Sequence, residues 1–118
     1  MGQVQMHGGA VIHTAAAVEA LPWLAFDGLD DVQNKVLWEL GDSHTGLMRL
    51  AEGGTIAPHR HHTGHHHVWV IEGHCSVLGT TIGAGSYAHV PAGVDHEIAG
   101  VGSEGCTLLY LYLADHAS

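Results

Sequence analysis

Short apolar runs separated by turn-forming residues fill the chain from Val32 onward, and this punctuation limits the possible folds more than any other feature. The turn signals are clusters of Gly, Pro, Asp or Ser, the residues that favour tight turns. They lie at Gly41-Asp42-Ser43, Gly53-Gly54, Glu72-Gly73, Gly83-Ala84-Gly85, Pro91-Ala92-Gly93 and Gly102-Ser103. The runs between them predict strands over residues 35–40, 46–51, 55–61, 66–71, 76–81, 86–90, 96–99 and 106–113.

About eight short strands is the size of a small closed barrel or a double-sheet jelly roll that can hold one small ligand. The sequence therefore predicts an all-β fold of that kind. The first thirty residues are the least strand-like, and Thr14 followed by AAAVEAL predicts one short helix that ends at Pro22. With 118 residues and no obvious linker, we expect a single domain over residues 1–118, with an N-terminal arm over residues 1–30.

The charge of the chain argues against one class of partner. Its net charge is -9 at pH 7, and its strong bases are Lys35, Arg49 and Arg60. We therefore expect no nucleic-acid partner, because phosphate backbones are bound by clustered positive charge. The N-terminal segment has no basic start and Glu19 interrupts its apolar part, so we expect neither a signal peptide nor a membrane span, and a cytoplasmic protein. Cys75 and Cys106 lack CxxC spacing, and we expect buried thiols.

Histidine is strongly enriched, at 13 of 118 residues, and the richest segment runs from His59 to His74. A purification tag is excluded as the cause because this segment is internal and interrupted. Successive side chains of a strand point to opposite faces, so the imidazoles of His59 and His61 should project to the same side. Several histidines aimed at one point favour iron, copper, nickel or zinc over calcium or magnesium. The alternative is a His-rich surface tract with adventitious metal affinity.

The surrounding residues resemble the two sequence motifs of the cupin superfamily. The first motif is matched by Gly53, His59, His61, His66 and Gly73, with His66 in a position usually held by glutamate. The second motif is matched by Gly85, Pro91, Gly93 and His96, with Gly100 where asparagine is usual. The resemblance covers residues 53–100.

This resemblance implies a cupin barrel, which is a double-stranded β-helix or jelly roll, with a metal-binding core over residues 45–113. It implies that His59, His61, His66 and His96 hold one divalent transition metal per chain. We expect Fe(II), with Zn(II), Mn(II), Ni(II) or Cu(II) as alternatives. It also turns His66, Val68 and Val70 toward the cavity and leaves His65 and His67 outside. His66 alternatively forms a hydrogen bond inside the barrel without contacting the metal.

The stretch KVLWELGDSHTGLMRLAEGGTIAPHRH resembles the subgroup of cupins that includes diketone-cleaving and hydroxyacetophenone-cleaving dioxygenases, and it is similar to the sensor domain of ChrR-type anti-sigma factors. The resemblance implies a non-haem Fe(II) dioxygenase that uses O2 to cleave a carbon–carbon bond of a small β-dicarbonyl or hydroxyketone. The first alternative is a Zn, Mn or Ni Lewis-acid isomerase, cyclase or lyase. The second is a non-catalytic metal- or ligand-sensing module.

A histidine in place of the usual glutamate leaves a divalent site at a charge of about +2, which favours an anionic chelating substrate such as an enolate. The candidate catalytic residues are Arg49, Glu97 and Tyr87. Arg49 could pair with Glu97 or with a substrate oxygen, although an outward position on the barrel wall is the alternative. Further candidates for contact with the site or its ligands are Glu72, Tyr87, His89, Tyr110 and Tyr112. We expect a homodimer with the first thirty residues in the contact, because so small a barrel has a limited core.

Overall fold

The computed structural model describes the backbone of residues 4–26, 29–60, 64–99 and 101–114, and the side chains of residues 8–25, 31–55, 64–94, 97–99 and 101–114. Within these residues, nine strands form one antiparallel sheet. They are β3 (Leu24–Phe26), β4 (Leu29–Leu40), β5 (Ser43–Leu50), β6 (Ile56–Arg60), β7 (Gly64–Val77), β8 (Thr80–Gly83), β9 (Tyr87–Val90), β10 (Asp95–Ala99) and β11 (Cys106–Ala114).

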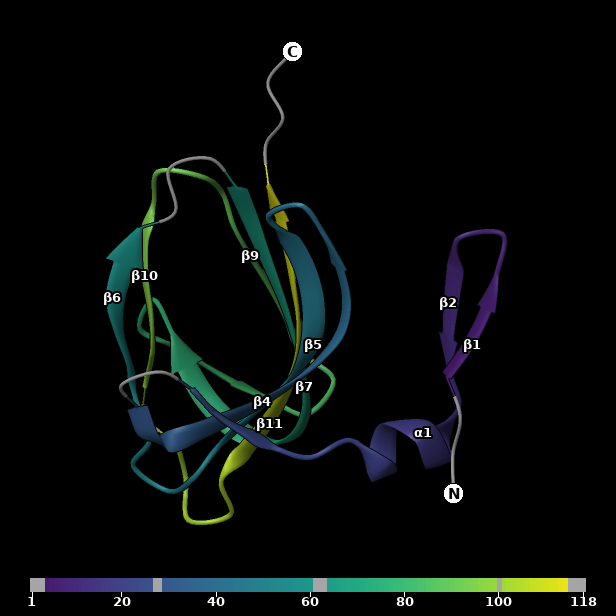
Figure 1. Cartoon of the computed structure of the whole chain (residues 1–118). Coiled ribbons are helices and arrows are strands. Elements are labelled where there is room, and N and C mark those ends of the chain that lie inside the picture. Colours follow the sequence, from purple (N-terminus) through teal and green to yellow (C-terminus); the bar gives the residue numbers. More distant parts are fainter. Residues whose placement is uncertain (1–3, 27–28, 61–63, 100, 115–118) are drawn as a thin grey trace.

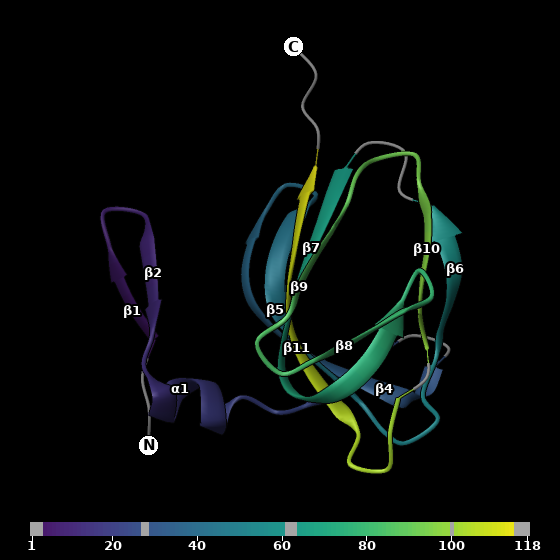
Figure 2. The ribbon, with the colours of Figure 1, turned by 180° about the vertical axis from the view of Figure 1, so that it is seen from behind.

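The sheet curls into a barrel, which confirms the predicted all-β class (Figure 1). Its strand order is β3-β4-β5-β11-β7-β10-β6, and β8 and β9 also pair with β7. Figures 1 and 2 show β5, β11 and β7 on one side of the barrel and the β6–β10 pair on the opposite side. β6 ends at Arg60 and β7 begins at Gly64, so the end of β6 and the start of β7 lie at the same end of the barrel.

The apolar core is built by alternate residues of the long strands. Leu50, Leu108 and Cys75 are among the most deeply buried side chains, each with at most 1% of its surface exposed. Leu50 of β5 lies opposite Cys106 of β11, and Leu108 of β11 lies opposite Met48 of β5. Because residues two apart in a strand share a face, the faces that carry these buried residues form the inner side of the wall built by β5, β11 and β7.

Strand β7 differs from the prediction, which placed a turn at Glu72-Gly73 between two strands. The strand runs unbroken from Gly64 to Val77, and it passes from pairing with β11 to pairing with β8 and β10. Gly73 makes this bend possible, because its φ is 74° and a Cβ there would lie 2.0 Å from the carbonyl oxygen of Gly105. The turn instead falls at Leu78-Gly79, where both φ values are positive, as a tight hairpin requires.

The N-terminal arm contains the predicted helix and an additional hairpin. Helix α1 (Ala15–Ala20) begins as expected at Thr14, whose hydroxyl accepts a hydrogen bond from the backbone N–H of Ala17 at 3.1 Å. Before it, β1 (Val4–His7) pairs only with β2 (Ala10–His13) within the described residues. The Gly8-Gly9 pair between them has φ values of 57° and 87° and forms the tight turn. A Gly-Gly pair is a hairpin signal in the sequence, although no hairpin was predicted for this segment.

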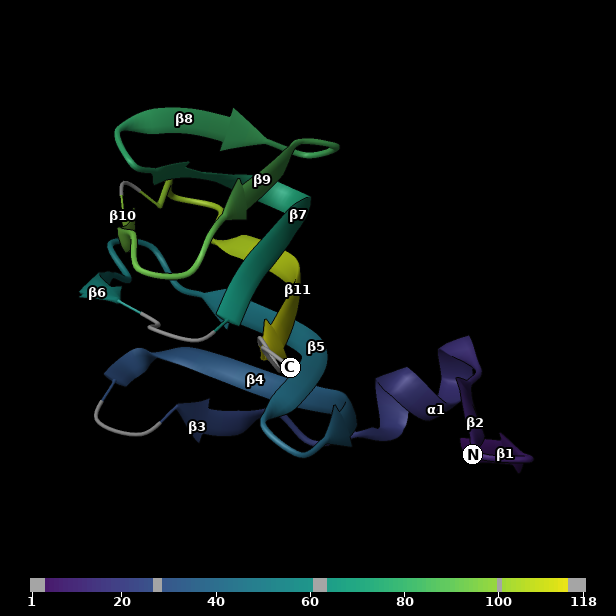
Figure 3. The same cartoon turned by 90° about the horizontal axis from the view of Figure 1, so that it is seen from above.

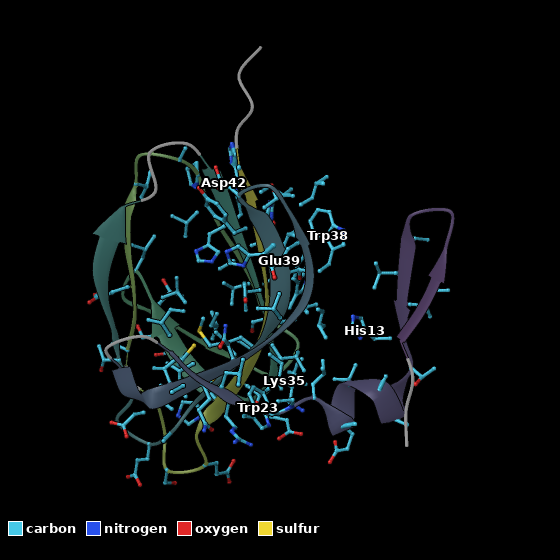
Figure 4. All side chains as sticks on the ribbon, viewed as in Figure 1. His13, Trp23, Lys35, Trp38, Glu39 and Asp42 are labelled. Carbon is cyan, nitrogen blue, oxygen red and sulfur yellow. The ribbon has the colours of Figure 1, made fainter. Side chains whose placement is uncertain are left out.

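The arm stands to one side of the barrel, as the view from above shows (Figure 3). Lys35 of β4 attaches it, since the buried Nζ atom donates a 2.8 Å hydrogen bond to the carbonyl oxygen of Val18 and lies 4.7 Å from the centre of the Trp23 ring. An imidazole nitrogen of His13, Nε2, is also hydrogen-bonded to the Leu37 carbonyl oxygen at 2.7 Å. Figure 4 shows Trp23 and Lys35 close to α1 and His13 facing the barrel. No described helix is long and apolar enough to cross a membrane.

Candidate metal centre

The alternation of burial along β7 decides which histidines face the interior. Val68 and Val70 are only 5% and 3% exposed, whereas Trp69 and Ile71 are 38% and 47% exposed. His66 has the same parity as the two buried valines, so it lies on the inner face and His65 and His67 lie on the outer face. This confirms the parity that the family resemblance implied.

An inner row of polar and aromatic side chains crosses three neighbouring strands at the level of His66. Tyr112 of β11 lies opposite His66 of β7 on one side and opposite His44 of β5 on the other. The His66 ring is 5.9 Å from the Tyr112 ring and 6.4 Å from the Tyr110 ring, centre to centre. The His44 ring is 5.7 Å and 5.4 Å from the same two rings. Two imidazoles therefore flank one pair of tyrosines.

His44 was not predicted as a site residue. The predicted strand over residues 46–51 began too late, whereas β5 begins at Ser43, whose hydroxyl accepts a 3.0 Å hydrogen bond from the backbone N–H of Ala114. Extending the strand by two residues would have placed His44 on the same face as Met48 and Leu50. The parity of His44 with Met48 and Leu50 could therefore have identified it as an inward residue. It was missed because the predicted strand began two residues too late.

The Nδ1 atom of His44 is buried and has no hydrogen-bond partner within the described part of the chain. A buried polar atom without a partner costs about 1–3 kcal/mol of stability, so such atoms commonly mark a place for a water or a ligand. The orphaned atom and the neighbouring inward His66 show that this end of the interior is built for polar contacts.

Two glycines make room for the tyrosines of this row. A Cβ at Gly64 would lie 2.3 Å from atoms of the Tyr112 ring, and a Cβ at Gly46 would lie 3.1 Å from the Tyr110 hydroxyl and 2.1 Å from the Lys35 carbonyl oxygen. Tyr110 is 3% exposed. Burial is the largest effect on its hydroxyl and raises the pKa. A hydrogen bond with Asn34 lowers the pKa, and the charge of Glu39 raises it, so that the net shift is upward. Tyr110 is thus a neutral phenol at physiological pH.

Two of the predicted ligands are brought together by the backbone register. His59 of β6 lies directly opposite His96 of β10, on the wall that faces β5, β11 and β7 (Figures 1 and 2). His61 lies outside the described residues, as do the side chains of His59 and His96. Among the side chains that are described, no group of three or more His, Cys, Asp or Glu residues is arranged to hold a metal. The predicted ligand set as a whole therefore stays a prediction.

The donor chemistry of these positions fits a transition metal. Neutral imidazole suits iron, copper, nickel and zinc, and ligating histidines usually need a partner for their other ring nitrogen. Tyrosines and a further histidine line the inner face beside His66. His59, His61, His66 and His96 are the residues that would hold such an ion.

Arg49 lies on the outside of the barrel, which is the alternative position that the sequence left open for it. Its neighbours Met48 and Leu50 point inward, so Arg49 points outward and is exposed. Its Nη2 donates a 2.6 Å hydrogen bond to Oε1 of Gln33, and its guanidinium lies 4.3 Å from the centre of the Trp23 ring. The pair with Glu97, which is half-buried on β10, is therefore not formed. Arg49 instead borders an outward pocket of about 530 Å³ that also includes Glu72.

Tyr87 also lies outside, with the outward histidines of β7 and β9. Its hydroxyl is hydrogen-bonded to Nδ1 of His67 at 2.5 Å, and Nδ1 of His65 is hydrogen-bonded to Nε2 of His89 at 2.9 Å. The His67 ring stacks on His89 with 4.8 Å between ring centres. Partial burial, followed by the charges of His89 and His65, lowers the pKa of His67. This outer cluster of Tyr87, His65, His67 and His89 therefore does not contact the interior site.

The two cysteines are buried free thiols, as the sequence predicted. Cys75 of β7 and Cys106 of β11 are hydrogen-bonded to each other at the apolar end of the core. The hydrogen bond to Cys75, with burial as the second cause, raises the pKa of Cys106 far above its ordinary value.

Solved structures with this fold differ in what they do. The polyketide cyclase RemF from Streptomyces resistomycificus has 17% sequence identity and a TM-score of 0.68, over 80% of this chain and 74% of that chain. The anti-sigma factor ChrR of Rhodobacter sphaeroides, in complex with SigE, has 19% identity and a TM-score of 0.67, over 79% of this chain and 50% of that chain. A putative ethanolamine utilization protein Q from Salmonella typhimurium has 17% identity and a TM-score of 0.74, over 98% of this chain and 96% of that chain. At these identities the likeness shows a shared fold, which does not specify one activity.

A search of curated proteins finds no match. The family comparison is more specific, because the family described as the ChrR cupin-like domain matches residues 11–114, which include α1 and all the strands of the barrel. The chain therefore belongs to the ChrR cupin-like domain family of the cupin superfamily.

Proposed function

We propose that this cupin is a non-haem Fe(II) dioxygenase that cleaves a carbon–carbon bond of a small β-dicarbonyl or hydroxyketone. The observation that carries the proposal is the direct cross-strand pairing of His59 and His96 in the β6–β10 pair, across the barrel from the wall on which His66 points inward (Figure 1). This arrangement supports an imidazole-only metal site built from His59, His61, His66 and His96.

The charge of such a site supports an anionic substrate. Imidazoles are neutral, so they leave a divalent ion at about +2, and a chelating enolate would neutralise more of this charge than a neutral ketone. Iron bound there would supply Lewis acidity to the enolate oxygens and electrons to O2. The reaction consumes one O2 per substrate and needs no external reductant, because both oxygen atoms end in the two carbonyl fragments.

The described residues around His66 would bind and shield the substrate. Tyr110 and Tyr112 provide ring faces on the interior wall, and Val68 and Val90 close the neighbouring positions with apolar surface. These groups exclude water from one side of the ligand, which strengthens polar interactions inside. The neutral phenol of Tyr110 adds no negative charge that would oppose an enolate.

The test is anaerobic reconstitution of the full chain with Fe(II), followed by oxygen-uptake measurements with a panel of β-diketones and hydroxyketones. We expect oxygen consumption in proportion to the cleaved substrate. The His59→Ala variant serves as the metal-free control. Stoichiometric Fe(II) binding without oxygen uptake on any compound of the panel would overturn the proposal.

Two alternatives keep the metal and remove the oxygen chemistry. A Zn(II), Mn(II) or Ni(II) Lewis-acid isomerase, cyclase or lyase is favoured if protein from its own host carries a redox-inert metal; the neighbouring fold of a polyketide cyclase supports this option. A sensing module is favoured by the family match to the ChrR cupin-like domain. A module of this kind would bind a ligand without turnover.

We also propose that the chain forms a homodimer through the outer face of β7 and β9, with the N-terminal arm in the contact. Trp69 and Tyr87 are 38% and 47% exposed on this face and pack against each other with 4.8 Å between ring centres. A two-stranded hairpin is only marginally stable alone in water, and β1 pairs only with β2 within the described residues. In the homodimer, a second copy of the chain would pack against both the N-terminal arm and this outer face.

A further inference from the structure

We propose that His44 is the residue that orients the small-molecule ligand of the interior site, through a hydrogen bond from its Nδ1 atom to an oxygen of an oxyanionic chelator such as an enolate. This inference rests on the proposed function, since it concerns the same site. It adds a specificity-determining residue that belongs to neither cupin motif.

The first argument is position. His44, Tyr112 and His66 occupy one level of the neighbouring strands β5, β11 and β7. Two strand spacings, about 10 Å, therefore separate the backbones of His44 and His66. Both imidazoles contact Tyr110 and Tyr112, so the two histidines face the same part of the interior. A small dicarbonyl that is held by an ion at His66 is of the right size to reach His44.

The second argument is the unused bonding capacity of His44. Its Nδ1 atom is buried and lacks a hydrogen-bond partner within the described part of the chain. Tyr110, the closest ring neighbour, interacts with Asn34 through its own hydroxyl, so that phenol is already engaged. A ligand oxygen would satisfy the Nδ1 atom, because a neutral imidazole with a proton on Nδ1 donates one hydrogen bond there.

The third argument is the surrounding frame, which holds the His44 ring in place. Ser43 is 6% exposed and ties the start of β5 to the end of β11 through its hydrogen bond with Ala114. Glu39 of β4 lies opposite His44 in the register. The two tyrosine rings cover the imidazole. A ring fixed in this way needs little ordering when a ligand binds, and preorganised groups of this kind improve affinity and selectivity.

The experiment uses the full chain loaded with Co(II), a stand-in for Fe(II) with a visible spectrum, and acetylacetone as the probe. Metal content is measured by elemental analysis, and the probe's dissociation constant by calorimetry and by the change in the Co(II) spectrum. The variants are His44→Phe, which keeps a ring without nitrogen, His44→Asn, which puts an amide near Nδ1, and His44→Gln, which puts one near Nε2. His74→Phe is the matched control, because His74 is exposed on the part of β7 that pairs with β8, away from the interior site.

We expect unchanged Co(II) content in all variants, about tenfold weaker acetylacetone binding by His44→Phe and His44→Gln, and substantial recovery by His44→Asn. Should His44→Phe fail to fold, the comparison of His44→Asn with His44→Gln still decides the outcome. Three results would overturn the inference alone: wild-type affinity in His44→Phe, loss of Co(II) in His44→Phe, or equal affinities of the Asn and Gln variants. A wild-type chain that takes up no Co(II) would overturn the proposed function itself, and the role of His44 with it.

Discussion

His59 of β6 and His96 of β10 are direct cross-strand partners, although each comes from a different motif of the sequence. Directly opposed positions in an antiparallel pair have Cβ atoms about 4.5–5.5 Å apart. That spacing suits two imidazoles that share one ion. The pairing is the structural basis for the first prediction.

Removal of either partner should weaken metal binding strongly. We expect His59→Ala and His96→Ala to lower the affinity for Zn(II) or Co(II) at least tenfold, because each removes one of few nitrogen ligands. Metal content after dialysis, measured by elemental analysis, checks this. His74→Ala is the control, since His74 is an exposed residue of β7. Unaltered metal uptake by either variant would contradict the proposed site.

A glutamate at position 66 should restore the residue type that is usual in the cupin motif. We expect His66→Glu to keep the metal but to weaken the binding of an enolate probe about tenfold, because the carboxylate lowers the charge of the site by one. Calorimetry on the metal-loaded variant measures this affinity. Tighter binding of the probe by His66→Glu would show that site charge does not select the ligand.

Gly64→Ala should destabilise the barrel by about 1–3 kcal/mol, because its Cβ would lie 2.3 Å from the Tyr112 ring. Chemical denaturation measures this loss. Gly83→Ala is the matched control, as its Cβ would meet nothing closer than 3.9 Å. The double variant Gly64→Ala/Tyr112→Leu should recover part of the loss, and equal effects of the two single alanine variants would refute the steric explanation.

Cys106 should remain protonated and unreactive in alkaline solution as long as the chain is folded. Its pKa is raised by the hydrogen bond with Cys75 and by burial, so folding favours the thiol at pH values above 9.0, where an exposed cysteine ionises. Because only the unfolded chain ionises this thiol, its contribution to the stability of the fold is fully present below pH 9.0 and is progressively lost as the pH rises above that value. Peptide mapping after iodoacetamide treatment at pH 9 should find Cys106 unmodified in the folded chain and alkylated in guanidinium chloride. Rapid alkylation of the folded chain would contradict the buried pair.

The homodimer should appear in size-exclusion chromatography with light scattering as a mass of about twice the 12.4 kDa of one chain. Trp69→Glu should shift this mass toward the monomer, because it places a charge on the outer face of β7. Leu40→Glu is the control, as Leu40 is 68% exposed at the end of β4. A wild-type mass of about 12 kDa at all concentrations would exclude the dimer.

The sequence by itself determined the features that depend on near neighbours. Thr14 caps α1 because capping needs only the next few residues. Alternation grouped His66, Val68 and Val70 on one face of a strand because side-chain direction has a period of two, and the family resemblance turned that face inward, as the burial of the two valines confirms. The motif glycines and histidines predicted the family, which the match over residues 11–114 bears out.

The tertiary structure decided everything that depends on distant partners. Gly73 gives a turn signal in the sequence, but the approach of Gly105 and the pairing with β8 turn it into a bend within one strand. Arg49 has the parity of an outward residue only because the sheet closes with Met48 and Leu50 inside. His44 joins Tyr112 and His66 through the register of three strands that are far apart in the chain. Local spacing cannot specify such meetings, because they depend on which strands pair, in which register, and which face the closed sheet turns inward.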